Sequence, residues 1–240
     1  MAAPALEKLE DVLRGLCLDI GGYADIDGVY GPSCASFPRA ISIGYAYQPE
    51  DLEGLEGGPT PAYYRAYGRL NTALNHAVAA VAECVKDRGY EALGCAATVS
   101  PEELDALGVE LTAAVQHKTA ATRAGLGWIG RSGLLVTKRY GPRIRLATVL
   151  TDMPLPTGNP VTQSRCGRCR RCVDACPAQA IQGALWSVGT ARDDLVDVTR
   201  CAEVAERLMA ERVGQVEAVC GVCMSVCPFG SAYGRRHDRP

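Results

Sequence analysis

The sequence predicts an α+β protein, with a front part of mixed helices and strands and a cysteine-rich part behind it. Two observations favour this class. Over residues 1–155, apolar segments with helical periodicity alternate with β-prone runs. After residue 155, cysteine becomes frequent, which marks a change in composition. Several helices combined with a sheet that contains an antiparallel element form an α+β domain.

The first elements are expected from periodicity and from the residues that bound them. Residues 4–15 have a helical pattern, and residues 40–47 form an apolar, β-prone run between two prolines. A long helix is expected over residues 61–88, because Thr60 followed by proline is typical of a helix start and Gly89 of a helix end.

Three further elements complete the front part. Residues 110–124 are expected to form a helix, and residues 134–138 and 144–151 two strands joined as a hairpin around residues 140–142. Residues 153–165, with three prolines and a glycine, are expected to form a linker. The linker divides the chain into two expected domains, residues 1–155 and residues 156–240.

The spacing of eight cysteines in the second domain predicts a metal cofactor. Cys166 opens a C-x2-C-x2-C-x3-C run, Cys220 opens a C-x2-C-x3-C run, each run ends before a proline, and Cys201 stands between them. In two-cluster ferredoxin modules, the fourth cysteine of such a run ligates the other cluster. We therefore expect a ferredoxin-like module with two 4Fe-4S clusters, in which each proline ends a short helix. The expected ligands of one cluster are Cys166, Cys169, Cys172 and Cys227, and those of the other are Cys176, Cys201, Cys220 and Cys223.

Two zinc sites are the alternative interpretation of these cysteines. Zinc knuckles pair C-x2-C units and rarely place three cysteines and a fourth before a proline, so the clusters are favoured. The remaining cysteines lie in apolar or small-residue settings and are expected to be buried structural thiols. They are Cys17, Cys34, Cys84 and Cys95.

Composition and charge exclude several classes of protein. Hydrophobic residues make up 48% of the chain and charged residues 22%, which is typical of a globular protein, and the net charge of −2 argues against a general nucleic-acid binder. No apolar run is long enough to span a membrane, and charged residues near the N-terminus argue against a secretory signal. With eight cysteines in a cluster pattern, a reducing cytoplasm is the expected location.

A glycine-rich loop at residues 125–130 matches the G-x-G-x-x-G pattern. A dinucleotide fingerprint needs a strand before this loop and a helix after it, whereas here the order is reversed, so nicotinamide binding is not expected. The glycines still allow the backbone to turn sharply and to approach another surface, either a flat cofactor or the cysteine-rich domain. The residues of this loop expected to bind a cofactor are Gly125, Gly127, Trp128 and Gly130.

Residues 124–155 resemble the core of epoxyqueuosine reductases and of cobalamin-dependent reductive dehalogenases. The shared features are the glycine-rich turn, a Gly-Pro-Arg-x-Arg segment that begins at Gly141 and a Thr-Asp-x-Pro-Leu exit that begins at Thr151. Residues 37–47 look like the early strand of the same families. The resemblance extends over roughly residues 37–230 and is in particular to the short members of the epoxyqueuosine reductase group.

The resemblance implies a nitroreductase-like catalytic domain that holds a cobalamin whose lower ligand is released. It also implies that the clusters pass electrons one at a time to cobalt, and that super-reduced cobalt attacks or reduces an epoxide or a carbon–halogen bond. A flavin is the alternative cofactor, because that fold also suits one. The expected partners are a reduced ferredoxin or flavodoxin as electron donor and a small-molecule substrate.

The sequence departs from the family pattern in two ways. Epoxyqueuosine reductases have an aspartate proton donor in a Val-Asp-Thr-x-Pro-Val stretch, and residues 108–127 contain no such stretch. The helical repeats that help to hold transfer RNA in long members are not matched, so transfer RNA is not the expected substrate. The hypothesis is that His117 with Lys118 replaces the missing acid, since histidine titrates near neutrality. A structural histidine bonded to a backbone carbonyl is the alternative.

Other side chains are candidates with an alternative beside each. Tyr64 is a candidate because the dehalogenase branch uses a tyrosine as proton donor, although packing at a helix start would also explain it. Arg143 and Arg145 are expected on one face of a strand, either binding an anionic substrate or the corrinoid or lying in solvent. Four more arginines are expected to raise a cluster potential or to steer an acidic donor, with a solvated loop as the alternative. They are Arg165, Arg168, Arg170 and Arg171.

The sequence therefore predicts an iron–sulfur oxidoreductase that passes electrons through two 4Fe-4S clusters to a cobalamin in the front domain and reduces a small electrophilic substrate. The alternatives are a ferredoxin-like electron carrier and an activator that reduces a corrinoid for another protein. A carrier needs no front domain of about 150 residues, which favours the reductase.

Overall fold

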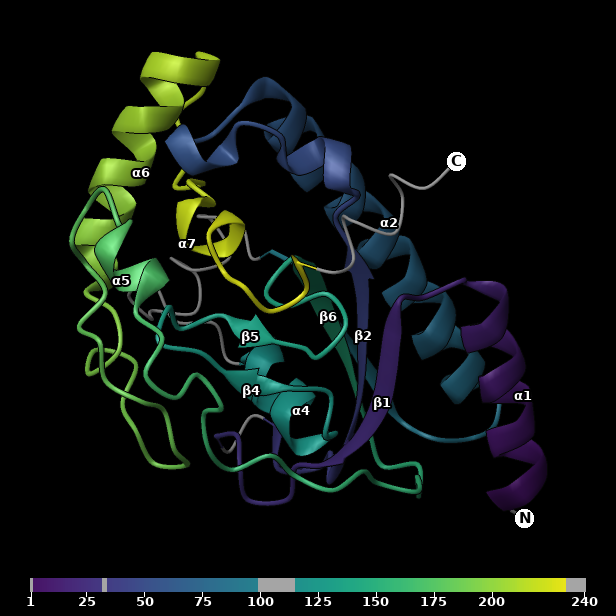
Figure 1. Ribbon diagram of the computed structural model, residues 1–240. Helices are drawn as coiled ribbons and strands as arrows, with labels where there is room; N and C mark the ends of the chain where they lie inside the picture. Colours follow the sequence, from purple (N-terminus) through teal and green to yellow (C-terminus); the bar gives the residue numbers. More distant parts are fainter. Residues whose placement is uncertain (1, 32–33, 99–114, 232–240) are drawn as a thin grey trace. The chain divides into compact units, whose positions relative to one another are not determined.

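The computed structural model describes residues 2–31, 34–98 and 115–231 (Figure 1). The chain forms two compact units, which we call the sheet unit and the cysteine unit. The sheet unit comprises Met1–Tyr45, Leu70–Leu126 and Arg145–Val161, and the cysteine unit comprises Ala46–Arg69, Gly127–Ile144 and Thr162–Pro240. Each unit is therefore assembled from three separate segments, and the domain boundary expected after residue 155 stays a prediction.

A four-stranded sheet forms the centre of the sheet unit (Figure 1). Its strand order is β1-β2-β6-β3, with β1 antiparallel to β2 and β3 antiparallel to β6. In the register, Ile20 lies opposite Gly44, and Ala92 lies opposite Thr151. The strands are β1 (Ile20–Asp25), β2 (Arg39–Ala46), β3 (Ala92–Cys95) and β6 (Ile144–Thr151).

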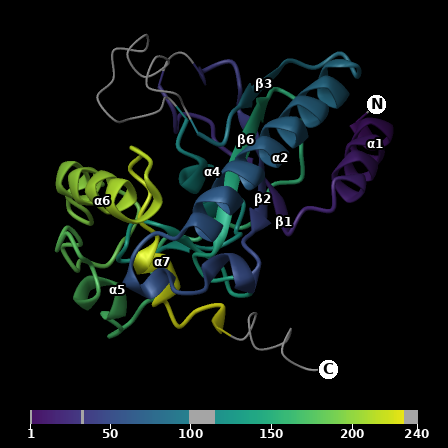
Figure 2. The same cartoon turned by 90° about the horizontal axis from the view of Figure 1, so that it is seen from above.

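Helices pack on both faces of this sheet. Because successive strand residues point to opposite faces, Ile41 of β2 packs with Leu9 of α1 and Leu74 of α2, whereas Ala40 packs with Ala120 of α4. Figure 2 shows α2 lying along the sheet. The helices are α1 (Ala2–Gly15), α2 (Pro61–Lys86), whose first residues belong to the cysteine unit, and α4 (His117–Arg123).

The cysteine unit contains shorter elements joined by loops. Its longest helix, α6, begins where the carboxylate of Asp197 accepts a hydrogen bond from the backbone N–H of Arg200 at 3.0 Å, and it ends at Gly214 in a left-handed conformation. The regular elements are β4 (Trp128–Ile129), β5 (Leu135–Val136), α5 (Arg171–Asp174), α6 (Val198–Val213), α7 (Val222–Ser225) and the 3-10 turns η2 (Pro49–Leu52) and η3 (Leu55–Gly57).

Several predicted elements are confirmed. The helix expected over residues 4–15, the strand over 40–47 and the helix over 61–88 correspond to α1, β2 and α2. Thr60 begins α2 as expected, because its hydroxyl accepts a hydrogen bond from the backbone N–H of Tyr63 at 3.2 Å. Of the helix expected over 110–124, the described part contains α4, and residues 110–114 lie outside the described residues.

The predicted hairpin between residues 134–138 and 144–151 is wrong. β5 pairs with β4, and β6 pairs with β3 in the other sheet. Thr137 forms a single bridge to Gly141, which has a left-handed φ of 58°, and the proline that follows has no N–H to extend a ladder. The pairing therefore ends after one bridge, and β6 joins a different sheet.

The free thiols outside the cluster pattern follow the expectation in part. Cys34 and Cys84 are buried and Cys95 is half-buried, but Cys17 is exposed, so the expectation for Cys17 is wrong. Cys17 lies in the turn that follows α1 and has a positive φ of 50°, a conformation found in turns rather than in a packed core. No helix in the described part of the chain combines the length and hydropathy needed to traverse a bilayer.

Candidate iron–sulfur site

The short helices of the cysteine unit position its cysteines. Cys172 lies within α5, and the helix closes as the N–H of Ala175 donates to the carbonyl of Arg171 at 3.0 Å. Cys223 lies within α7, which begins at Gly221 with a left-handed φ of 82°. A proline follows the last cysteine of each run and prevents the helix from continuing. The expectation of a short helix before each proline is confirmed.

The thiols gather into two groups. Burial, with a smaller contribution from the neighbouring thiols of Cys166 and Cys172, raises the pKa of Cys227 to about 11. Burial also raises the pKa of Cys201, and the thiols of Cys176 and Cys220 add to that increase. The last cysteine of each run thus lies beside the other group, which is the arrangement that the expected ligand sets require.

The donors suit a cluster that spreads its ligands over the corners of a cube. A cube of four irons needs four thiolates at separate corners rather than at one point. Thiols that repel one another when ionised become thiolate ligands when iron supplies the positive charge.

Two arginines from the segment between β4 and β6 hold the loops that carry cysteines. Arg143 donates to the carbonyl oxygens of Ser225 and Cys227 at 2.9 Å each and of Phe229 at 2.6 Å. Arg131 donates to the carbonyl oxygens of Gly167 at 2.7 Å and Cys169 at 3.0 Å, and also to that of Gly183. The structure therefore places Arg143, expected to bind a cofactor, against the loop of a predicted cluster ligand. Sequence reasoning did not single out Arg131.

The cavity that includes Cys227 lies next to Arg143. Its volume is about 700 Å³. Burial lowers the pKa of the Arg143 guanidinium, and the Cys227 thiol opposes that decrease. The lining residues are Arg143, Arg171, Asp174, Ala175, Ser225, Val226, Cys227, Pro228 and Ser231.

Protein surfaces explain the closest approaches of the glycine-rich loop. A Cβ atom at Gly127 would collide with the carbonyl oxygen of Val136, and one at Gly130 would lie 2.9 Å from a methyl group of Val136 and 3.5 Å from the sulfur of Cys166. Gly125, in the sheet unit, has a left-handed φ of 77°, and its Cβ would lie 2.7 Å from the carbonyl oxygen of Asn159. The surface that Gly130 approaches therefore includes a predicted cluster ligand.

Trp128 is the residue of this loop with an unused polar atom. Its side chain is buried, with 2% of its surface exposed, and its ring meets that of Phe229 edge to face with centroids 4.9 Å apart. The indole N–H has no hydrogen-bond partner among the described residues. Because a buried donor is normally satisfied, it is available to an acceptor on a bound group.

In the sheet unit, His117 makes hydrogen bonds through both ring nitrogens. Its Nδ1 lies 2.8 Å from the hydroxyl of Thr148, and its Nε2 lies 2.9 Å from the carbonyl oxygen of Ala96. A carbonyl only accepts, so Nε2 carries the hydrogen and Nδ1 accepts from Thr148. Burial, with a smaller contribution from the charge of Arg145, lowers the pKa of His117 to about 4. These contacts are those of the structural alternative.

Arg145 belongs to the same polar network. Its guanidinium donates to Oδ1 of Asn71 at 2.7 Å, to the hydroxyl of Thr98 at 2.7 Å and to the carbonyl of Ala97 at 3.2 Å. Asn75 accepts from the backbone N–H of Ala97 at 3.0 Å. Arg143 and Arg145 therefore donate to different groups, which lie in different units.

The other two predicted catalytic residues, Lys118 and Tyr64, lie in different helices. Lys118 follows His117 in α4 and is half-buried. Tyr64, near the start of α2, donates a hydrogen bond to the carboxylate of Glu217 at 2.9 Å, and this bond is the main cause of its raised pKa. The neighbouring Tyr63 is buried against Tyr47, with ring centroids 5.3 Å apart, as the packing alternative requires.

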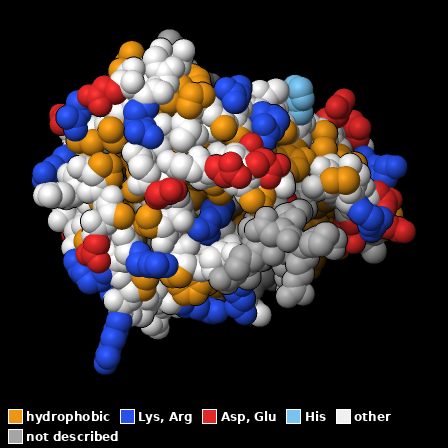
Figure 3. Space-filling model, turned by 45° about the horizontal axis from the view of Figure 1, so that its top comes forward, with side chains coloured by type: hydrophobic (Ala, Val, Ile, Leu, Met, Phe, Trp, Pro, Cys, Tyr) orange, Lys and Arg blue, Asp and Glu red, His pale blue; other side chains and the backbone are white. Residues whose placement is uncertain are grey.

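The four arginines of the first cysteine run are exposed. Arg165 lies over the ring of Trp128, 5.8 Å from its centroid, and Arg170 lies 4.0 Å from the carboxylate of Asp174. On the face drawn in Figure 3, basic and acidic side chains lie among one another, as expected for a net charge of −2. Local rather than overall charge therefore distinguishes this run.

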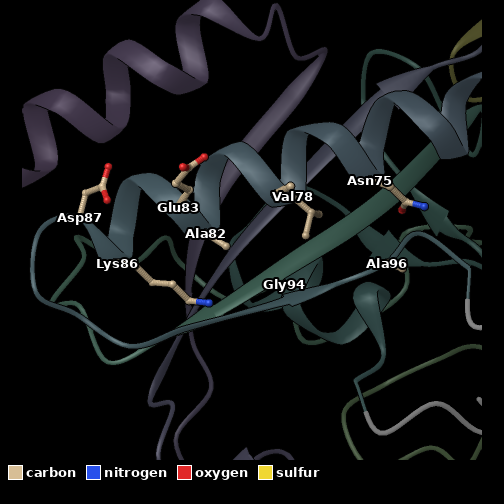
Figure 4. Close-up of a pocket in the computed structure, with 9 residues that line it drawn as sticks. Asn75, Val78, Ala82, Glu83, Lys86, Asp87, Gly94 and Ala96 are labelled. Carbon is tan, nitrogen blue, oxygen red and sulfur yellow. The ribbon is translucent and has the colours of Figure 1, made fainter.

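A second groove lies in the sheet unit between α2 and β3 (Figure 4). Its volume is about 690 Å³, and at Gly94 a Cβ atom would lie 2.5 Å from a methyl group of Val78. The groove contains none of the predicted site residues. It is lined by Asn75, Val78, Ala79, Ala82, Glu83, Lys86, Asp87, Gly94 and Ala96.

Parts of this sequence are similar to known proteins. Residues 165–230 match the family model of the 4Fe-4S double cluster binding domain. An epoxyqueuosine reductase of Synechocystis sp. is 32% identical over 136 residues, which cover 53% of this chain and 44% of that protein. A tetrachloroethene reductive dehalogenase of Desulfitobacterium hafniense is 28% identical over 244 aligned positions, which cover 96% of this chain and 40% of that protein.

The fold is also shared with a solved structure. A reductive dehalogenase, whose structure suggests a mechanism for B12-dependent dehalogenation, superimposes with a TM-score of 0.69 at 22% identity, over 95% of this chain and 32% of that chain. At this identity the likeness shows the fold alone. The chain spans less than half the length of either of these two curated relatives.

These findings define first a class of protein, one that carries two 4Fe-4S clusters on a double-cluster domain. Within that class, the chain is an iron–sulfur protein of the epoxyqueuosine reductase-like and reductive dehalogenase-like type. The resemblance seen in the sequence is thereby confirmed, and so is its mixed helix and sheet architecture.

Proposed function

We propose that this protein is a reductase that passes single electrons from a reduced ferredoxin or flavodoxin, through its two clusters, to a cobalamin. The observation that carries the proposal is the gathering of the cysteine thiols into two groups, each with one member from the other run. Iron–sulfur clusters supply one-electron transfer when bound. A reducing cytoplasm, in which thiols stay reduced, suits this chemistry. The substrate class would be a small electrophile, an epoxide or an organohalide.

A bound cofactor beside the glycine-rich loop is supported by Trp128. Its buried indole N–H is an unused donor, and cobalamin carries amide and phosphate acceptors around its edge. Gly127 and Gly130 are already explained by protein contacts, and Gly125 and Arg145 have partners in the sheet unit, so Trp128 carries this part of the proposal. A flavin also carries acceptors, and a nitroreductase-like domain would suit either cofactor.

Reduction of the proposed substrate also needs a proton donor. His117 as proton donor would have to leave Ala96 and Thr148, and with a pKa of about 4 it is neutral at pH 7. We infer that Lys118 or Tyr64 is the better donor and that His117 positions the network. If His117→Gln abolished turnover of a reducible substrate while cobalamin and iron contents stayed normal, this inference would fail.

One experiment tests the cofactor directly. Anaerobically purified protein would be mixed with cobalamin and, separately, with flavin, and the absorption spectra recorded with the iron and sulfide contents. A base-off cobalamin spectrum, lost in Trp128→Phe, supports the proposal. If the protein bound flavin and not cobalamin, flavin would be the proposed cofactor. If it bound neither, the electron-carrier alternative would be favoured. Zinc without iron or sulfide would refute the whole proposal.

A further inference from the structure

The two cysteine groups differ in the charges that surround them. Three predicted ligands of one cluster lie in the first run, and the fourth is Cys227. A guanidinium holds each of the two loops that carry these ligands. Arg131 donates to the carbonyl oxygen of Cys169, and Arg143 donates to that of Cys227. Two cations from one segment, residues 127–144, thus converge on the loops of a single cluster.

Several hydrogen bonds hold each of these two arginines in a fixed position. Each guanidinium donates to three backbone carbonyls, which fixes its position more tightly than a mobile surface side chain. Both side chains are half-buried, so water screens their charges only in part. Gly141, with φ 58°, brings the same segment against the carbonyl of Phe229, where a Cβ would collide.

The other group has an anionic neighbour instead. The backbone N–H of Cys201 donates to the carbonyl oxygen of Asp197 at 3.0 Å, so this acidic residue lies one helical turn from a predicted ligand. Asp197 also caps the N-terminus of α6, so it offsets the partial positive charge that this helix end presents near Cys201. The first group is therefore beside fixed positive charge, and the second beside a negative one.

The geometry points to a fixed order of reduction: the cluster on Cys166, Cys169, Cys172 and Cys227 has the higher potential, and Arg131 and Arg143 are the positioning residues that raise it. Adding one electron makes a cluster more negative, so a nearby cation stabilises the reduced form. With both clusters bound, an electron from a low-potential donor, which is oxidised in the step, would reside mainly on this cluster. This inference rests on the proposed function for its donor but not on cobalamin.

The experiment is a redox titration of the full-length protein with dithionite, followed by electron paramagnetic resonance. Cys227→Ser and Cys201→Ser identify the signals, because each alters one cluster. We expect the signal that changes in Cys227→Ser to appear first in the unaltered protein. If the signal that changes in Cys201→Ser appears first, the inference is overturned, while cluster content and cobalamin binding still judge the proposed function.

Charge variants test the cause. Arg143→Gln should shift the first signal to lower potential. Arg143→Lys should shift it less, because lysine keeps the charge although it loses the fixed hydrogen bonds to three carbonyl oxygens. The matched control is Arg168→Gln, which removes an exposed arginine next to Cys169 and should shift the signal least. Equal shifts in Arg143→Gln and Arg143→Lys would mean that the hydrogen bonds of Arg143, and not its charge, set the potential, and would overturn the role of charge. Should either variant lose its iron, the order in the unaltered protein still decides.

Discussion

In the sheet unit, residues far apart in sequence meet through buried apolar side chains of regular helices and strands, whereas in the cysteine unit guanidinium–carbonyl bonds, glycine contacts and thiols join loops beside buried side chains such as Trp128 and Met209. Leu9, Ile41 and Leu74 have no exposed surface and belong to one core cluster. In the cysteine unit, α5 and α7 have four residues each, far below the roughly 12–15 at which an isolated helix becomes marginally stable. The helices α5 and α7 are therefore too short to be stable alone, and we expect bound clusters to help to order the loops around them.

The two units should therefore respond differently to substitution. A core of apolar side chains responds to lost volume, and a metal-dependent loop region responds to lost ligands. Substitutions in each unit should separate these two responses.

Removing a predicted ligand should have the largest effect. Cys223→Ala should cost about half of the bound iron and sulfide, because one of two clusters is lost, and it should also unfold the loops that this cluster orders. Iron and sulfide analysis, with hydrogen exchange over residues 162–231, measures both. Cys84→Ala, at a buried thiol of the sheet unit, is the control and should leave the iron content unchanged. Full iron content in Cys223→Ala would contradict the ligand assignment.

Loss of core volume should act on the sheet unit. Leu74→Ala removes a side chain with no exposed surface and should lower the free energy of unfolding by about 2–5 kcal/mol. Urea denaturation of the cluster-loaded protein gives this value, and the iron content per folded molecule should stay the same. A loss below about 1 kcal/mol would show that this core is not tightly packed.

His117 should make stability depend on pH. Its pKa falls from 6.5 in the unfolded chain to about 4 in the folded protein, so the unfolded chain binds more protons between these values. Its contribution is therefore fully present above pH 6.5 and is lost as the pH falls towards 4, by at most about 3 kcal/mol. His117→Gln should flatten this part of the stability profile, as measured by urea denaturation at several pH values. A variant with an unchanged slope would rule out this source.

The smallest effect is expected at Tyr64. Tyr64→Phe removes one hydrogen bond to Glu217 in a partly exposed setting and should cost at most about 1 kcal/mol. The free energy of unfolding should change little, so a loss of turnover in this variant would be chemical and not structural. Unchanged turnover would remove Tyr64 from the candidate proton donors.

Local patterns were sufficient to predict part of the structure. Thr60 and Pro61 marked the start of α2, and the prolines after each cysteine run marked the ends of α5 and α7, because capping and the missing proline N–H act over a few residues. β1 and β3 were not predicted, since each is short and contains glycine. The pairing of residues 134–151 was predicted incorrectly, because strand pairing depends on partners distant in sequence.

The sequence by itself determined the cysteine chemistry, because ligand spacing is set by the local geometry of a turn and a short helix. Only the tertiary structure decided what the other candidates contact. It placed Arg143 on the Cys227 loop and gave His117 two hydrogen-bond partners, and it brought Arg131 to Cys169 although no motif had marked it. A hydrogen bond between residues tens of positions apart depends on how the whole chain packs, and no local pattern encodes that.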